Sequence, residues 1–374
     1  MLASQTPALL NYFNDRQTQI LQFIREVVEI ESPSYDMEGS RAVVARLGAA
    51  AKQLENVDSI EQIAAPGYGD HLIIRAFSSL PEKPILLLGH TDTVHPRGSL
   101  ATKPFRIEGD KVFAPGIFDM KSGGVLMFEV LRAFEILAIK PSHPIVILLS
   151  CDEEIGSPTG REIVEREASK AAFCLVIEPS APGGKAKTGR KGTATYTLKA
   201  HGVPAHAGLE PERGASAILE LAHQIHKIHA LNKPEIGTTA NVCTISGGTA
   251  TNVIPDAAEC EIDVRFTSMS EASRIETEIN NLKPVDERVS LQVIGEINRP
   301  PLERTEKIVE LYEKARQIAA SFNYELGETQ VGGASDGNFV AVLGVPVLDG
   351  LGIQGDGAHT HHEHILLSDI PKRA

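Results

Sequence analysis

The chain has 374 residues, a length that predicts about two domains at roughly 100–200 residues each. Hydrophobic residues make up 42% and charged residues 23%, which is close to the soluble globular average and excludes a disordered, collagen-like or coiled-coil chain. Lys and Arg total 36 and Asp and Glu total 49, so the net charge of −13 repels phosphate backbones. Nucleic acid is therefore not expected as a partner.

The longest apolar runs, such as residues 145–149, are far shorter than the about 20 residues of a membrane-spanning helix, so we expect no membrane segment. The N-terminal residues lack the pattern of an export signal, which predicts a cytoplasmic protein, although a mature periplasmic chain would also lack one. The cysteines are widely spaced and are expected to be buried structural thiols: Cys151, Cys174, Cys243 and Cys260.

Up to about residue 186, short apolar runs alternate with helical segments. The runs at 85–88, 145–149 and 173–177 predict strands, and the segments at 120–136 and 161–168 suit helices. This alternation is typical of a layered α/β sheet.

The periodicity changes between about residues 187 and 296. Residues 193–200 and 259–266 alternate strictly between polar and apolar side chains, as in strands with one face in a core and one in water. Strands and helices follow in the order βαββαβ, which is the ferredoxin-like unit, at 193–200, 214–231, 240–246, 258–266, 270–282 and 289–296.

The α/β pattern then resumes with a helical segment at 305–321 and an apolar run at 340–348. We therefore predict an α/β domain built from residues 1–186 and 297–374, with a ferredoxin-like domain inserted at 187–296. On the inserted domain's first helix, a row of histidines is expected to be an outer or interface stripe rather than a metal site: His223, His226 and His229.

Polar side chains follow each apolar run of the first domain. His90 and Asp92 follow the first run, Asp152, Glu153 and Glu154 follow the second, and Glu178 follows the third. Sites in open α/β sheets lie beyond the carboxyl ends of the strands, so we expect these side chains at one edge, with Asp119 between them.

Taken alone, each residue has an ordinary structural explanation. A His-x-Asp pair is more often structural, Asp119 suits a helix cap, and an acidic stretch is often a solvated loop. Their coincidence favours a metal site, because neighbouring carboxylates repel one another and a cation removes that repulsion.

Nitrogen and oxygen ligands without cysteine favour zinc, with manganese or cobalt as substitutes. A late glycine-rich loop adds four histidines, of which one site uses one or two: His359, His361, His362 and His364. Ligands with one shared carboxylate suggest two ions about 3.5–4 Å apart that hold a water and lower its pKa to about 7. Glu153, beside a ligating Glu154, would take the proton of this water.

Seven short strings are spread over nearly the whole chain in a recognisable order: GHTDTV, GIFDMKSGG, CDEEIGS, VIEPS, GVPAHAG, GGTATNVIPD and GAHTHHEH. They resemble the M20 family of dinuclear zinc peptidases, and within it the carboxypeptidase G2-like glutamate carboxypeptidases. The resemblance implies a catalytic α/β domain with a ferredoxin-like lid through which the protein forms a homodimer.

The resemblance also implies a role for each site residue. His90, Asp119 and Glu178 would hold one zinc ion of each subunit. Asp119, Glu154 and His359 would hold the second, with Asp119 bridging. Asp92 would orient His90, Glu153 would be the general base, and the bond from Asp119 to Met120 would be cis.

In the lid, the resemblance implies that His206 reaches the partner subunit's active site and stabilises the oxyanion. Asn252 and Arg265 would bind the substrate carboxylate, and Arg299 matches a pocket region, as does the turn at Ser335 and Asp336. Arginine suits a carboxylate because its planar guanidinium group can donate two parallel hydrogen bonds to it.

The implied function is metal-dependent hydrolysis of an amide bond next to a free carboxylate, which releases a C-terminal amino acid such as glutamate from peptides or N-acyl amino acids. Within the family, the alternative is an N-acyl amino acid deacylase that acts on acetylornithine or succinyl-diaminopimelate.

Two alternatives belong to other classes. A serine hydrolase would use Ser335, Asp349 and His359, but it leaves the acids at positions 119, 153, 154 and 178 without a role. A non-catalytic metal-dependent binding protein would not need Glu153 or His206.

Overall fold

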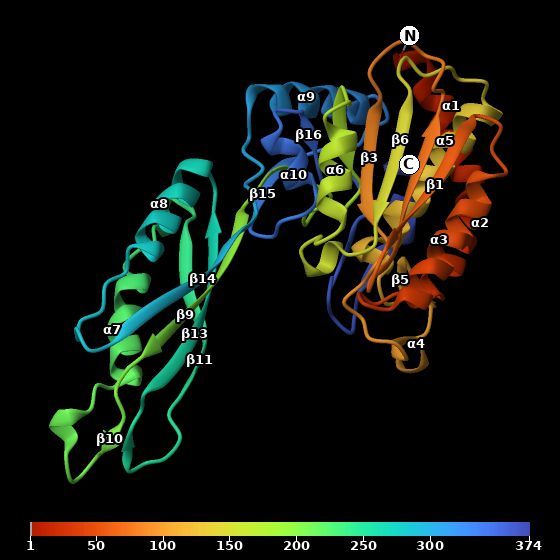
Figure 1. Ribbon diagram of the computed structural model, residues 1–374. Helices are drawn as coiled ribbons and strands as arrows, with labels where there is room; N and C mark the ends of the chain where they lie inside the picture. The colour runs from red at the N-terminus through yellow and green to blue at the C-terminus, as the bar shows by residue number, and fades with distance from the viewer. Residues whose placement is uncertain (1) are drawn as a thin grey trace. The chain divides into compact units, whose positions relative to one another are not determined.

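The computed structural model describes residues 2–374, which divide into two compact units (Figure 1). The first unit runs to Gly189 and resumes at Arg304–Val331 and Ser335–Ala374. The second comprises Arg190–Glu303 and Gly332–Ala334. Strand β14 (Ser290–Arg299) carries the second unit beyond residue 296, where the sequence pattern had suggested that the insertion ends.

The first unit is built on a six-stranded sheet with the order β1-β2-β6-β3-β7-β16. Its strands are β1 (Val57–Ala65), β2 (Gly69–Ala76), β3 (Ile85–His90), β6 (Ile145–Ser150), β7 (Phe173–Val176) and β16 (Val347–Leu348). The strands β6, β3, β7 and β16 run parallel, and β1 and β2 are antiparallel additions at one edge. Every residue of β6 is buried, as expected for a strand covered on both faces.

Helices pack on this sheet through apolar stripes. The helices α2 (Gln17–Val28), α3 (Met37–Ala51) and α5 (Ser122–Ile136) share one buried apolar cluster with β2 and β6. The remaining longer helices of the unit are α1 (Leu2–Asp15), α6 (Gly160–Ala168), α9 (Glu306–Ala320) and α10 (Gly337–Val342). Among the described helices, none has the length and apolar character needed to cross a bilayer.

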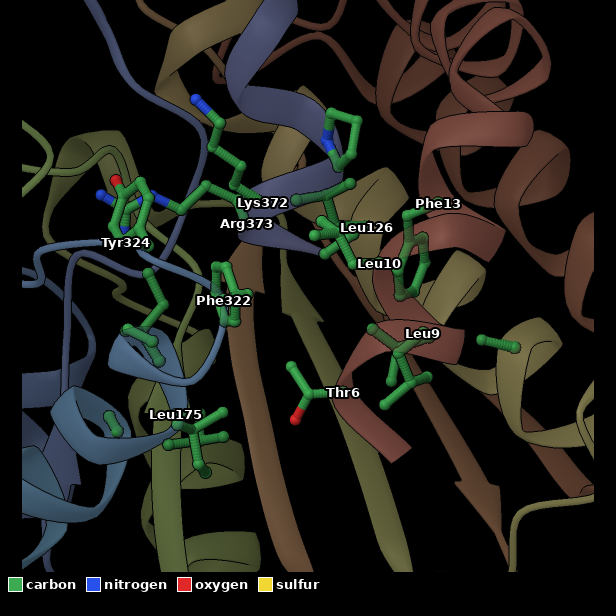
Figure 2. Close-up of a pocket in the computed structure, with 18 of the residues that line it drawn as sticks. Thr6, Leu9, Leu10, Phe13, Leu126, Leu175, Phe322, Tyr324, Lys372 and Arg373 are labelled. Carbon is green, nitrogen blue, oxygen red and sulfur yellow. The ribbon is translucent and has the colours of Figure 1, made fainter. Parts of the chain in front are cut away.

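A largely apolar pocket of about 410 Å³ lies in the first unit, between α1, α5, α9 and the last residues of the chain (Figure 2). Leu9, Phe13, Leu126 and Phe322 line it. Among the described residues that line this pocket, none is a predicted site residue. The pocket is therefore separate from the edge of the sheet where the polar side chains gather.

The second unit confirms the predicted ferredoxin-like order. Its antiparallel sheet has the order β11-β13-β9-β14. Its elements follow along the chain as β9 (Gly192–His201), α7 (Ala217–His229), β11 (Thr239–Gly247), β13 (Ala257–Phe266), α8 (Met269–Asn280) and β14. The buried face of β9 and β13 consists of the apolar positions of the two alternating segments: Ala194, Tyr196, Leu198, Ala200, Cys260, Ile262, Val264 and Phe266.

The exposed positions of the second unit confirm one expectation and correct another. His223, His226 and His229 are exposed on α7, as an outer stripe should be. Cys243 was expected to be buried, but it is exposed, because it lies at a register shift in the edge strand β11. The other cysteines are buried, as predicted: Cys151, Cys174 and Cys260.

A small sheet of the first unit holds the loop that carries Asp119. Glu363 directly precedes β18 (His364–Leu366), which pairs with β5 (Lys111–Phe113). The Glu363 side chain is buried, and its carboxylate accepts the amide N–H groups of Gly116 at 3.0 Å, Phe118 at 2.9 Å and Asp119 at 2.9 Å. The same carboxylate also contacts His95 Nε2. One side chain therefore fixes the whole turn.

We predict that Glu363→Ala lowers the free energy of unfolding by about 3–5 kcal/mol, because it leaves buried amide donors and His95 without their acceptor. Glu363→Gln keeps one acceptor oxygen and should lose less. Urea unfolding of both variants beside the unmodified protein measures the difference. An alanine variant as stable as the unmodified protein would contradict the role of Glu363.

Candidate metal centre

Three adjacent parallel strands deliver polar side chains to one edge of the sheet. His90 ends β3 and lies in register with Ser150 at the end of β6. Glu153 and Glu154 lie in the short turn η2 (Glu153–Ile155) that follows β6, and Glu178 follows β7. Asp119 comes from the turn η1 (Ile117–Lys121), and its peptide bond to Met120 is cis, as the resemblance implied.

These side chains form two groups that share Asp119. In the first, His90 Nε2 lies 3.3 Å from Asp119 Oδ1 and 3.3 Å from Glu178 Oε1. In the second, His359 Nε2 lies 3.2 Å from Asp119 Oδ2 and 3.1 Å from Glu154 Oε2. Within each group, the candidate ligand atoms all lie within 4.8 Å of one another. The two oxygens of Asp119 thus face two different histidines.

The electrostatics of both groups favour a bound cation. Burial lowers the pKa of His90, but hydrogen bonds to Asp119, Asp92 and Glu178 outweigh this effect and raise the pKa well above its ordinary value. Hydrogen bonds to Asp119 and Glu154 raise the pKa of His359 to about 10. Burial raises the pKa of Glu154 to about 7. The clustered carboxylates therefore favour a nearby positive charge, and a divalent cation would supply that charge.

The donor set fits such an ion. Glu154 Oε1 is buried and has no hydrogen-bond partner among the described residues, so it can serve as a ligand. The side chain of His359 is 51% exposed, which leaves the second group open to small molecules, whereas that of His90 is 1% exposed. Imidazole nitrogen and carboxylate oxygen ligands suit zinc, manganese or cobalt.

Asp92 does more than the sequence suggested. His90 Nδ1 lies 2.9 Å from the backbone oxygen of Asp92 and 3.4 Å from its carboxylate, so the backbone is the closer partner of the ring. The carboxylate accepts the amide N–H groups of Glu153 and Glu154, both at 3.2 Å, and the Ser34 hydroxyl at 2.7 Å. Asp92 therefore positions the histidine and the acidic turn together.

Asp336 also holds the acidic turn. Its buried carboxylate accepts the hydroxyl of Ser150 at 2.8 Å and that of Ser157. The resemblance placed Asp336 in a pocket region, and its contacts with Ser150 and Ser157 show that it also has this structural role.

The serine-hydrolase alternative is contradicted by the geometry. Ser335 is fully buried, and its hydroxyl donates to Asp349 at 2.8 Å. His359 contacts Asp119 and Glu154 instead of the serine. The three residues therefore do not form a proton relay that ends on an accessible hydroxyl.

Of the four histidines in the late loop, His359 alone joins the described acidic groups. His361 and His362 are exposed, in keeping with a site that uses only one or two of these histidines. His364 is buried, because it begins β18 and its ring packs 5.1 Å from that of Phe113.

In the second unit, His206 and Asn252 lie side by side. The strand β10 (Ala205–His206) pairs with β12 (Val253–Ile254), and the amide of Ala207 donates to the backbone oxygen of Asn252 at 2.9 Å. His206 Nδ1 accepts the amide N–H groups of Gly208 and Leu209, both at 3.1 Å. The ring proton therefore sits on Nε2, which makes this exposed histidine a hydrogen-bond donor.

Arg265 and Arg299 lie together elsewhere in the second unit. They flank Thr193 of β9 on the neighbouring strands β13 and β14. Arg265 forms an ion pair with Asp263 at 2.9 Å, and Arg299 is buried. At about 3.3 Å per residue, β9 carries the chain roughly 26 Å from Thr193 to His201, and β10 follows after that. The arginine pair and the His206–Asn252 pair therefore lie apart.

Comparisons with known proteins identify the family of this chain. Peptidase family M20/M25/M40 matches residues 86–374. The chain is 30% identical to carboxypeptidase G2 of Pseudomonas sp. (strain RS-16), over 96% of this chain and 88% of that protein. It is 28% identical to succinyl-diaminopimelate desuccinylase of Stenotrophomonas maltophilia (strain K279a), over 94% of this chain and 95% of that protein.

The fold is also similar to that of a solved relative. The crystal structure of aminopeptidase PepT from Bacillus cereus superposes with a TM-score of 0.78 at 22% identity, covering 96% of this chain and 95% of that one. The family match over most of the chain, together with two full-length relatives, confirms the resemblance seen in the sequence strings. The chain belongs to peptidase family M20/M25/M40 and is a metal-dependent hydrolase.

Proposed function

We propose that the protein cleaves an amide bond next to a free carboxylate and releases a C-terminal amino acid such as glutamate from small peptides or N-acyl amino acids. The observation that carries this proposal is the sharing of Asp119 by two ligand groups, with Glu153 immediately before the ligand Glu154. The similarity to carboxypeptidase G2 over almost the whole chain supports release of a C-terminal residue. Glutamate is proposed as that residue because the sequence strings resemble those of glutamate carboxypeptidases.

We propose two zinc ions per subunit, which manganese or cobalt can replace. His90, Asp119 and Glu178 would hold one ion, and Asp119, Glu154 and His359 the other. When bound, such ions supply Lewis acidity that polarises the scissile carbonyl and lowers the pKa of water from 15.7 to about 7.

Glu153 is the proposed general base. Its amide N–H is held by Asp92, and the residue is only 8% exposed, so little solvent competes for its carboxylate. The carboxylate takes a proton from the attacking water and returns it to the leaving amide nitrogen, which departs as an amine. The second product carries the new carboxylate.

His206 is proposed to donate its Nε2 proton to the oxyanion that forms on the carbonyl oxygen. Arg265, Arg299 and Asn252 are proposed to bind the substrate carboxylate. Because roughly 26 Å of β9 separates the arginines from the His206 end, one small substrate does not reach both ends of one lid. We therefore propose a homodimer in which His206 and Asn252 serve the partner subunit's site.

The second unit offers a surface for this dimer. Strand β11 is an edge strand of its sheet, and most of its second half is exposed, including Ile245 at 55%. An exposed strand edge with apolar side chains is suited to pairing with a second copy.

We expect Glu153→Ala to keep both metals and to lose hydrolysis by about 10²–10⁴-fold, because the attacking water no longer has a proton acceptor. Metal content and kcat, measured on the same preparation, test this. Glu153→Gln is the matched control for shape, and it should be equally inactive. Near-normal turnover in either variant would refute the base assignment.

A substrate panel tests the released residue. With zinc present, peptides and N-acyl amino acids that end in glutamate should be cleaved, and the same compounds with a C-terminal carboxamide should react at least about tenfold more slowly, because an arginine loses its bidentate partner. Faster hydrolysis of N-succinyl-diaminopimelate or N-acetylornithine would instead favour the deacylase function, to which the similarity to the desuccinylase points.

A mixing experiment tests the shared site. His206→Ala and Glu153→Ala should each be inactive as pure dimers. After subunit exchange, half of the dimers are mixed, and each contains one site with both residues intact, so about one quarter of the normal activity should return. If mixing restores nothing although exchange is demonstrated, His206 acts in its own subunit.

A further inference from the structure

The turn that carries Glu153 and Glu154 is closed by a single carboxylate at its start. Asp152 is fully buried, and its Oδ2 accepts the Thr159 amide at 2.7 Å, the Thr159 hydroxyl at 2.6 Å and the Gly160 amide at 3.1 Å. This oxygen therefore joins the two ends of the 152–160 segment and caps the start of α6. This closure holds the acidic turn together with Asp92 and Asp336.

A buried histidine from a different strand completes the closure. His71 of β2 is 1% exposed, and its Nε2 lies 2.9 Å from the Thr159 hydroxyl oxygen. Its Nδ1 accepts the amide N–H of Cys151 at 3.2 Å. Because Nδ1 is an acceptor, the ring proton sits on Nε2 and points to Thr159, whose own proton goes to Asp152. The hydrogen bonds thus run in one direction, from the Cys151 amide to Asp152.

Two side chains of this relay, His71 and Asp152, also lie close enough to Cys151 for the three to hold a metal ion. A neutral imidazole that accepts at Nδ1 and donates at Nε2 has no lone pair left for a metal. Burial lowers the pKa of His71 and raises that of the Cys151 thiol, which favours the neutral forms of both. The hydrogen-bond relay therefore accounts for the cluster better than a third ion does.

The side chains of Asp152 and His71 pack closely against Gly160. A Cβ atom at Gly160 would lie 2.7 Å from Asp152 Oδ1 and 3.4 Å from His71 Cε1, so glycine is required where α6 begins. Asp152 Oδ1 itself has no hydrogen-bond partner among the described residues, which leaves Oδ2 as the oxygen through which this carboxylate is held.

We propose that His71 is a positioning residue that acts through Thr159 and Asp152 to hold the turn bearing Glu153 and Glu154. This inference rests on the proposed function for the roles of those two acids. It predicts a selective effect, because only the ligand group of Asp119, Glu154 and His359 draws a side chain from this turn. The group of His90, Asp119 and Glu178 is carried by other elements and should be spared.

The test compares Thr159→Val, which removes the hydroxyl at nearly constant shape, with Thr159→Ser, which keeps it. Co²⁺ is titrated into each metal-free protein and followed by its visible absorption, and kcat and KM are measured with zinc. We expect the valine variant to lose at least about tenfold in affinity at one of two Co²⁺ sites, with the other changed less than about twofold, and to lose kcat at least tenfold with KM little changed. The serine variant should resemble the unmodified protein.

His71→Gln disturbs the same relay at its histidine, and it should reproduce the selective loss of affinity at one Co²⁺ site. Valine and serine variants that behave alike, or a valine variant that loses both sites equally, would overturn the proposal. A third equivalent of Co²⁺ with a thiolate charge-transfer band that disappears in Cys151→Ser would also overturn it, in favour of a third ion. If the unmodified protein binds two Co²⁺ ions but hydrolyses no substrate, the proposed function fails while the comparison of metal affinities still decides the relay.

Discussion

The sharing of Asp119 by two histidines is the constraint on which the rest of the site depends. Its two carboxylate oxygens lie 3.3 Å and 3.2 Å from His90 and His359, which come from distant parts of the chain. The carboxylates of Glu154 and Glu178 crowd against the same pair. Such a concentration of buried anions is unfavourable unless cations neutralise it, and the two candidate ligand groups that share Asp119 would allow two divalent ions to do so.

Buried carboxylates also build the scaffold around this centre. Glu363 holds the turn that carries Asp119, whereas Asp92, Asp152 and Asp336 hold the turn that carries Glu153 and Glu154. Each accepts several hydrogen bonds from backbone amides or hydroxyls, which is how a buried carboxylate offsets the loss of its water. The candidate ligands are thus held in place by buried carboxylates that are not themselves candidate ligands, an arrangement that is common around protein metal sites.

Much of the fold, and the strand ends that meet at the site, could be predicted from the sequence. The period-two alternation in β9 and β13 identified the buried face of the second unit, and the runs before His90, Glu153 and Glu178 identified the strand ends that meet at the site. The sequence did not reveal the roles of Glu363, His71 and Thr159. Their partners are backbone amides and side chains that lie far away along the chain. No local pattern marks such contacts.

The sequence by itself determined which strands are buried and where they end, since hydrophobic periodicity and strand termini are local properties of the chain. It also determined the family, through strings spread over almost its whole length. Only the tertiary structure decided that Asp92 serves the acidic turn as well as His90, that His364 is buried, and that the arginines lie apart from His206. These three features depend on how strands from separate segments pair and in which register, because hydrogen bonds form between groups that are close in the folded structure and not along the chain.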